Sequence, residues 1–432
     1  MKYCLIEHLN TEYKLPEDYV YVALTQEVIF ILDQRKIDYI TFEDFYTSGE
    51  VRGDTDAFMV EQLKWFDKFD ELLKSVYPDA KKLNLNLASI YYYWLTYMID
   101  NVILTCRIIR KFIDSTNPKK ISFVSIKYKD DKLKQGPNIL HYRGVESTYS
   151  RLIEPLCNDY GLSFERLFIS DFYAADENEK PVLTIRAKNK FRLTYNLYNY
   201  LRQLKNILRI LIISNLSFSS IKTRMLFLTL DNYVYEFSKT FIHKPVKYFV
   251  YQKGIIRQII YFFLKKSLIT KSIVNTNSID TNYDNNKIFL NDIYEWVNNK
   301  CELDISKVIN TRMDIFVNII CPQIIQLVPV YLEYYKKEKI DYIITSQIFT
   351  IEEHAIIAAA SLTNNTKTIY ISHGADAIEA KNRYFKLIRY FDYYFTQTKR
   401  EAENENAIKN EFSKSSPIIH SVNYMSNSFH NL

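Results

Sequence analysis

The last third of the chain contains the pattern that most restricts its fold, two strand-like runs separated by a helix-like run. The run from Asp341 to Ser346 is apolar and β-branched and ends in a hydroxyl residue, and Thr366 to Ile371 is similar. Between them, Thr350 to Glu353 matches a capping box that opens a helix. These three runs predict a βαβ unit with two parallel strands. Ser346 and the residues after Ile371 are therefore expected at the same edge of one sheet.

The residues that follow the second of these strands are chemically distinctive. Ser372, His373 and Gly374 come directly after it, in a chain that has only 7 glycines. A glycine after a strand lets backbone N–H groups approach an anion, and a histidine can accept or donate a proton near neutral pH. The competing interpretation is a strand-ending turn with an incidental histidine. We predict a catalytic role for His373. Substrate contacts are expected at Gly374, Asp376 and Ser346.

A second polar segment follows a predicted strand earlier in the chain. Ile121 to Ile126 is β-branched and aromatic, and the polar residues 127–144 follow it. Ligands gather at the carboxyl ends of strands in open α/β sheets, so His141 and Arg143 are predicted to bind substrate on position alone. An ordinary surface loop is the alternative interpretation.

Strand-like and helix-like runs also alternate in the first half of the chain. Strands are expected at 3–6, 19–24 and 39–42, around a helix at 26–34, and long helices at 56–112. The long apolar run 288–339 is expected to be helical, with interruptions at Pro322 and Pro329. The sequence therefore predicts an α/β protein with a Rossmann-like parallel sheet and long helical insertions. At 432 residues, two domains or one enlarged domain are expected.

The net charge of +6 is distributed unevenly. Residues 181–274 contain 17 Lys and Arg but only Asp231 and Glu236, a net +15, whereas the polar residues 275–286 are typical of a linker. Such a basic segment can hold an anionic membrane surface, a phosphorylated acceptor or nucleic acid. Solvated basic helix faces are an equally acceptable interpretation.

Cysteine spacing and the first residues of the chain bear on its compartment. The 5 cysteines form no Cys-x-x-Cys pair and have no histidine at metal-ligand spacing, which predicts reduced thiols and no metal site. The first apolar run, Met1 to Ile6, meets Glu7 and His8 too early for a signal peptide. Polar residues interrupt every long apolar run. We expect a cytoplasmic protein, peripheral at the inner face of the cell membrane.

Several short segments of the chain resemble the GT-B transferases that make bacterial and archaeal surface polysaccharides. This broad group includes the capsule Kdo-type transferases and the CDP-glycerol glycerophosphotransferases. The resemblance rests on the following segments: Asp341-Tyr342, Glu353-His354-Ala355, Ile371-Ser372-His373-Gly374, Phe391-Asp392-Tyr393-Tyr394-Phe395, and the opening Ala23-Leu24-Thr25 through Ile37-Asp38-Tyr39-Ile40-Thr41.

The resemblance implies a transferase of the cell envelope or capsule with no cofactor. It would move a sugar or polyol phosphate from a nucleotide-sugar or CDP-polyol donor to a lipid-linked or glycan acceptor, with His373 as the catalytic residue. It implies that residues 1–396 correspond to the N-terminal, acceptor-side half of a GT-B fold. Residues 397–432 would begin a donor-binding domain that is missing or truncated, so this chain alone is expected to be inactive.

Two other functions compete with this interpretation. A nucleic-acid-binding protein would use the basic segment 181–274 with its interleaved aromatic residues, but we rank nucleic acid below membrane and glycan partners. An epimerase that acts on sugar nucleotides shares the two-domain α/β design, but the chain has no complete donor-binding motif to support it.

Overall fold

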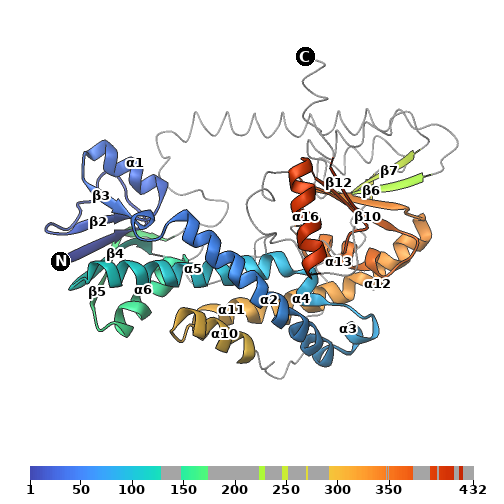
Figure 1. Cartoon of the computed structure of the whole chain (residues 1–432), viewed down its shortest axis with the longest axis horizontal. Helices are drawn as coiled ribbons and strands as arrows, with labels where there is room; N and C mark the ends of the chain where they lie inside the picture. Colours follow the sequence, from blue (N-terminus) through green and yellow to red (C-terminus); the bar gives the residue numbers. More distant parts are fainter. Residues whose placement is uncertain are drawn as a thin grey trace, which may run out of the picture. The chain divides into compact units, whose positions relative to one another are not determined.

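The computed structural model describes residues 1–127, 147–173, 223–228, 246–251, 269–270, 291–346, 348, 350–372, 390–396, 398–412 and 418–421. The protein is α/β, as predicted, and forms two compact units, each with its own parallel sheet (Figure 1). Unit 1 contains Met1–Glu61, Trp94–Asn189 and Lys287–Ile315. Unit 2 contains Gln62–Tyr93, Lys190–Asn286 and Phe316–Leu432.

Sheet A of unit 1 has five parallel strands in the order β3-β2-β1-β4-β5. Its strands are β1 (Lys2–Ile6), β2 (Val20–Ala23), β3 (Tyr39–Thr41), β4 (Lys120–Lys127) and β5 (Ser163–Tyr173). The chain moves outward from β1 to β3 and then returns to place β4 on the other side of β1. The order therefore reverses between β1 and β4, which is the kind of switch point where α/β proteins bind ligands.

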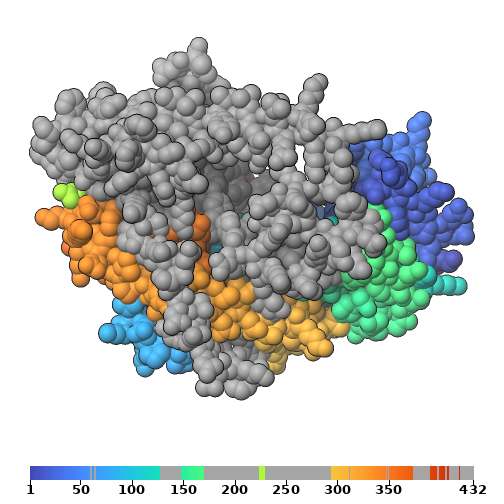
Figure 2. All heavy atoms as spheres, turned by 180° about the vertical axis from the view of Figure 1, so that it is seen from behind, coloured from blue at the N-terminus to red at the C-terminus, as the bar shows by residue number. Residues whose placement is uncertain are grey.

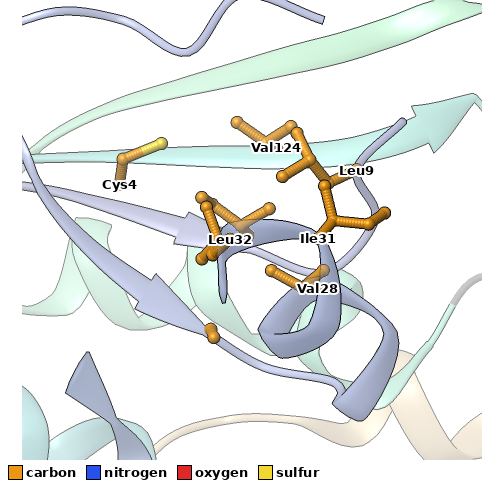
Figure 3. Packing of buried hydrophobic residues seen from close by; sticks show 8 residues of the cluster. Cys4, Leu9, Val28, Ile31, Leu32 and Val124 are labelled. Carbon is orange, nitrogen blue, oxygen red and sulfur yellow. The ribbon is translucent and has the colours of Figure 1, made fainter. Parts of the chain in front are cut away.

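One face of sheet A packs on α1 (Gln26–Arg35), whose start and end are both set locally. The Thr25 side chain accepts a hydrogen bond from the Val28 N–H at the start, and Lys36 adopts the left-handed conformation at the end. The buried residues of the cluster are Cys4, Ile6, Leu9, Ala23, Val28, Ile31, Leu32 and Val124. Figure 3 shows the sheet residues of this cluster meeting the apolar face of α1.

The other helices of unit 1 come from distant parts of the chain. They are η1 (Phe42–Asp44), α6 (Thr148–Asp159), α10 (Asn291–Cys301) and α11 (Ser306–Ile315). Parts of α2 (Ser48–Val76) and α5 (Tyr92–Thr116) also belong to unit 1. Arg110 Nε donates to the Cys301 carbonyl over 2.8 Å, and this bond ties α5 to α10. Residues of α6 and β5 form part of the molecular surface, as the green spheres of Figure 2 show.

Sheet B of unit 2 has seven parallel strands in the order β12-β11-β10-β9-β6-β7-β8. The strands are β6 (Thr223–Phe227), β7 (Val246–Tyr251), β8 (Ile269–Thr270), β9 (Tyr342–Thr345), β10 (Lys367–Ile371), β11 (Tyr393–Thr396) and β12 (Ile418–Ser421). The parallel pairing of β9 with β10 confirms the predicted βαβ unit. The order reverses between β6 and β9, so both sheets are compatible with a Rossmann-like fold.

Two aspartates fix the register at the amino ends of strands in sheet B. Asp341 Oδ2 accepts a hydrogen bond of 2.7 Å from the Arg224 N–H of β6. Asp392 Oδ2 accepts one of 2.8 Å from the Thr368 N–H of β10. Each aspartate therefore ties the start of its own strand to the neighbouring strand.

The helices of unit 2 also come from distant parts of the chain. They are the last part of α2 and the first part of α5, with α3 (Pro78–Lys82), α4 (Leu87–Ile90), the π-helical turn η4 (Phe316–Ile320), α12 (Cys321–Glu338), α13 (Ile351–Ser361) and α16 (Lys399–Phe412).

One of these helices differs from the expectation based on the sequence. Pro322 lies at the start of α12, but Pro329 lies inside it, so the prediction that the helix is interrupted at Pro329 is wrong. Ile325, Val328 and their buried neighbours anchor this helix, and that packing outweighs the bond lost at the proline.

The structure also bears on the expected domain boundary, the basic segment and the cysteines. The boundary expected at residue 396 lies within unit 2, and β12 beyond it pairs with β11 and so extends sheet B. Of the basic segment 181–274, only β6, β7, β8 and Leu228 are described, and the linker 275–286 lies outside the described residues. The five cysteines are buried and free, as predicted.

One helical stretch of the described chain, Ser306–Glu338, is long and apolar enough to cross a membrane. The core helix of a soluble protein has the same length and composition, and 61% of the apolar window is buried here. This stretch is therefore weak support for a membrane span.

Asp70 of α2 provides a test of how unit 2 is held together. Its buried carboxylate accepts hydrogen bonds from the Ala88 N–H at 2.7 Å, from the Ser89 N–H at 3.2 Å and from Ser89 Oγ. We expect Asp70→Ala to lower the free energy of unfolding by about 2–4 kcal/mol in a urea titration, because several buried donors lose their partner. Asp79→Ala, at an exposed position on α3, is the control and should change it by less than about 1 kcal/mol. Equal effects of the two substitutions would contradict this account.

Candidate functional site

Buried hydroxyl residues lie at the carboxyl ends of neighbouring strands in sheet B. Thr345 ends β9 and Ser346 follows it, Ser372 follows β10, and Thr396 ends β11. All four are buried. Because β9, β10 and β11 are parallel neighbours, these residues lie along one edge of the sheet. This edge begins beside the switch point between β6 and β9, where a ligand is expected.

Ser346 is the one predicted site residue that the structure describes. It lies directly after β9, at the switch point, and is fully buried. The other five predicted site residues, His373, Gly374, Asp376, His141 and Arg143, lie outside the described residues. Their roles stay predictions.

Ser372, the residue before His373, is held by two hydrogen bonds. Its N–H donates to the Phe395 carbonyl of β11 over 2.8 Å. Its Oγ donates to Glu401 Oε1 over 2.5 Å, and Glu401 is fully buried. A hydrogen bond from a hydroxyl to an ionised carboxylate is stronger than one between neutral groups. The end of β10 is therefore fixed both to the next strand and to the helix after it.

Glu401 reaches Ser372 because of the way α16 begins. The Glu401 N–H donates to Thr398 Oγ1 over 3.1 Å, which is half of the capping-box pattern that Thr398 and Glu401 form in the sequence. Its carboxylate accepts a hydrogen bond from Ser372 Oγ. The motif is visible in the sequence, but the partner on β10 is not, because the two residues meet only in the folded sheet.

The start of α13 forms the predicted capping box in full. Thr350 Oγ1 accepts from the Glu353 N–H at 3.1 Å, and Glu353 Oε2 accepts from the Thr350 N–H at 2.9 Å. His354 is buried behind this turn, with Nδ1 2.7 Å from the Thr350 carbonyl oxygen and its ring 4.3 Å from that of Tyr91. His354 is therefore a buried residue that contacts the helix cap.

The charges along this edge limit where an anion could bind. Glu352 and Glu353 are buried in the first turn of α13, and Glu401 is buried in the first turn of α16. A helix N-terminus normally attracts anions, but here carboxylates of the chain itself already lie there. A ligand phosphate would be repelled at both helix starts.

The part of the chain described by the structure contains no group of three or more His, Cys, Asp or Glu side chains that could hold a metal ion. The buried edge instead offers hydroxyl groups and carboxylates, which suit hydrogen bonding and proton transfer.

The fold and this edge define an α/β protein with two parallel sheets, each of which reverses its strand order once. No protein-family model, curated protein or solved structure matches the chain.

The buried imidazole of His354 makes stability depend on pH. Burial lowers its pKa from 6.5 to about 4, so the unfolded chain binds a proton at a higher pH than the folded chain does. The stabilisation from this site is complete above about pH 6.5 and is lost as the pH falls toward 4, by roughly 3 kcal/mol. We expect His354→Phe to flatten the pH dependence of the urea midpoint in this range. The control is His430→Phe, and an equally steep dependence in both variants would refute the assignment.

The bond between Ser372 and Glu401 can be measured by a double-mutant cycle. Ser372→Ala and Glu401→Ala should show a coupling free energy of about 1.5–3 kcal/mol, the range for hydrogen bonds to charged groups. Ser361 is a matched control, because its hydroxyl donates to the Ala358 carbonyl at the far end of α13. The cycle of Ser361→Ala with Glu401→Ala should give a coupling near zero. Additive effects of Ser372→Ala and Glu401→Ala would show that the bond contributes nothing.

Proposed function

We propose that this chain is a GT-B-type transferase of surface polysaccharide biosynthesis. It transfers a sugar or a polyol phosphate from a nucleotide-activated donor to a lipid-linked or glycan acceptor. The support begins with the motifs Asp341-Tyr342, Ile371-Ser372-His373-Gly374 and Phe391-Asp392-Tyr393, which resemble this group. Two parallel sheets with the reversed strand order of doubly wound proteins are also what a GT-B transferase requires.

The observation that carries the proposal is the position of Ser372. The buried Glu401 carboxylate is hydrogen-bonded to the residue immediately before His373, at the carboxyl end of a central strand. His373 would remove the proton of the acceptor hydroxyl as the donor phosphate leaves. Gly374 would let backbone N–H groups approach that phosphate.

The remaining predicted contacts follow from this assignment. Ser346 and Asp376 would orient the donor or the acceptor, and His141 and Arg143 would bind substrate. The basic segment 181–274 would hold acceptor phosphate or anionic lipid at the inner face of the cell membrane, which makes the protein peripheral rather than spanning.

The proposal is tested by nucleotide release and by nucleotide binding. Purified chain is incubated with UDP-, GDP-, CMP- and CDP-linked donors and a lipid-linked acceptor, and the affinity for the free nucleotides is measured by calorimetry. If His373 is the base, His373→Ala lowers the release rate about 10²–10⁴-fold and changes nucleotide affinity little. His430→Ala, at a histidine outside every motif, should leave both unchanged.

Two results would overturn the proposal. Undiminished turnover by His373→Ala would remove the base from its role. A chain that neither releases nor binds any of the nucleotides would not be a nucleotide-dependent transferase.

A further inference from the structure

Two buried cysteines of unit 1 lie next to each other, although 195 positions separate them in the chain. Cys106 lies in α5, and Cys301 is the last residue of α10. Cys106 Sγ donates a hydrogen bond to the Cys301 carbonyl oxygen over 3.4 Å, and the two side chains are also hydrogen-bonded to each other. Thiols in such contact lie within reach of a disulfide.

The guanidinium of Arg110 lies beside this pair and holds the end of α10. Its Nε donates to the same Cys301 carbonyl oxygen over 2.8 Å. Its Nη2 donates to the Glu302 carbonyl over 2.7 Å and to Asp159 Oδ2 over 2.9 Å. Cys106 Sγ and the guanidinium therefore meet at one carbonyl oxygen. A fixed positive charge beside a thiol stabilises the thiolate, which is the form that reacts with oxidants.

The two thiols of the pair differ in how readily they ionise. Hydrogen bonding to Cys301 and, to a smaller extent, the charge of Arg110 lower the pKa of Cys106 against the opposing effect of burial. The hydrogen bond to Cys106 and burial raise the pKa of Cys301. By contrast, burial is the main cause that raises the pKa of Cys4 and of Cys157 to about 12. The pair thus combines an easily ionised sulfur with a thiol that can attack it once it is oxidised.

The pair is buried, but it lies close to the surface of unit 1. Both cysteines are 0% exposed, whereas Glu302, the residue after Cys301, is exposed. The ion pair of Arg110 with Asp159 is also in contact with solvent, because the exposed fractions of these side chains are 14% and 38%. Local opening at this helix end would therefore admit a small oxidant to Cys106.

We propose that Cys106 and Cys301 form a redox-sensitive site, at which a peroxide oxidises Cys106 and Cys301 then closes a disulfide between α5 and α10. The Cys106 thiolate attacks one peroxide oxygen, the O–O bond breaks, and the departing hydroxide takes up a proton to become water. The Cys301 sulfur then attacks the sulfur of the Cys106 sulfenic acid. The S–O bond breaks, and the second hydroxide leaves with the Cys301 proton as water. Two thiols and one peroxide thus give one disulfide and two waters.

The disulfide would decide whether α5 and α10 can separate at this point. In the reduced chain, hydrogen bonds from Cys106 and Arg110 hold the end of α10, and such bonds open and close. In the oxidised chain a covalent bond replaces them, which is the kind of change by which redox sensors respond to peroxide. This inference does not rest on the function proposed above, because neither cysteine belongs to the site at β10.

The test treats the reduced full chain with a small excess of hydrogen peroxide at pH 7. Acid stops the reaction, the remaining thiols are alkylated in urea, and peptides are identified by mass spectrometry. We expect a disulfide between Cys106 and Cys301 as the main product, and dithiothreitol should restore both thiols. Cys106 should be oxidised at least about tenfold faster than Cys157, because a nearby cation stabilises its thiolate.

Two variants separate the roles of the two cysteines. Cys301→Ser should leave Cys106 as a sulfenic acid, which dimedone captures. Cys106→Ser should leave Cys301 reduced, because its own thiol ionises with difficulty. Cys157→Ser is the matched control at another buried thiol of unit 1, and it should form the disulfide at an unchanged rate.

Three outcomes would overturn the inference. They are the absence of the Cys106–Cys301 disulfide in the folded chain, oxidation of Cys157 as fast as that of Cys106, and an equal share of this disulfide in chain unfolded by urea. The unaltered chain gives all three results, so the question is decided even if a variant unfolds. Because the assay contains no nucleotide or acceptor, its failure leaves the proposal for His373 standing, and failure of that proposal leaves this site standing.

Discussion

The register of sheet B depends on a hydrogen bond that recurs at the amino ends of its strands. Asp341 and Asp392 each precede a tyrosine that begins a strand, and each carboxylate accepts the N–H of a residue in the neighbouring strand, Arg224 or Thr368. In a parallel sheet a slip of one residue would turn every side chain to the opposite face. By fixing the start of β9 against β6 and of β11 against β10, the two aspartates also determine which residues lie at the far edge. The buried row of Thr345, Ser372 and Thr396 is a consequence of that register.

Most elements of the fold could be predicted because their signals are local. The capping box that begins at Thr350 and the β-branched runs of β4, β9 and β10 each predict an element from a few neighbouring residues. Pro329 was misjudged because a proline's local effect is visible in sequence, whereas the burial that holds α12 together is not. Two separate sheets were not foreseen either, since their strands are assembled from distant parts of the chain.

The candidate site residues also divide into those with a local sequence signal and those whose contacts form only in the folded chain. Ser346 was found from its position after a strand, which is a local signal, and it does lie at the switch point of sheet B. Glu401 was missed as a partner of Ser372 because 29 residues separate them and only the pairing of β10 with β11 brings them together.

The buried thiols of both units have a practical consequence for measuring local motion. Burial is the main cause that raises the pKa of Cys4 and Cys157 to about 12 in unit 1, and it also raises the pKa of Cys321 in unit 2. A thiol reagent needs the thiolate and free access, and the folded protein denies it both. Alkylation can therefore proceed only through transient opening of the surrounding helices and strands. These cysteines are divided between the two units. The alkylation rate of each thiol therefore reports how often the unit that contains it opens.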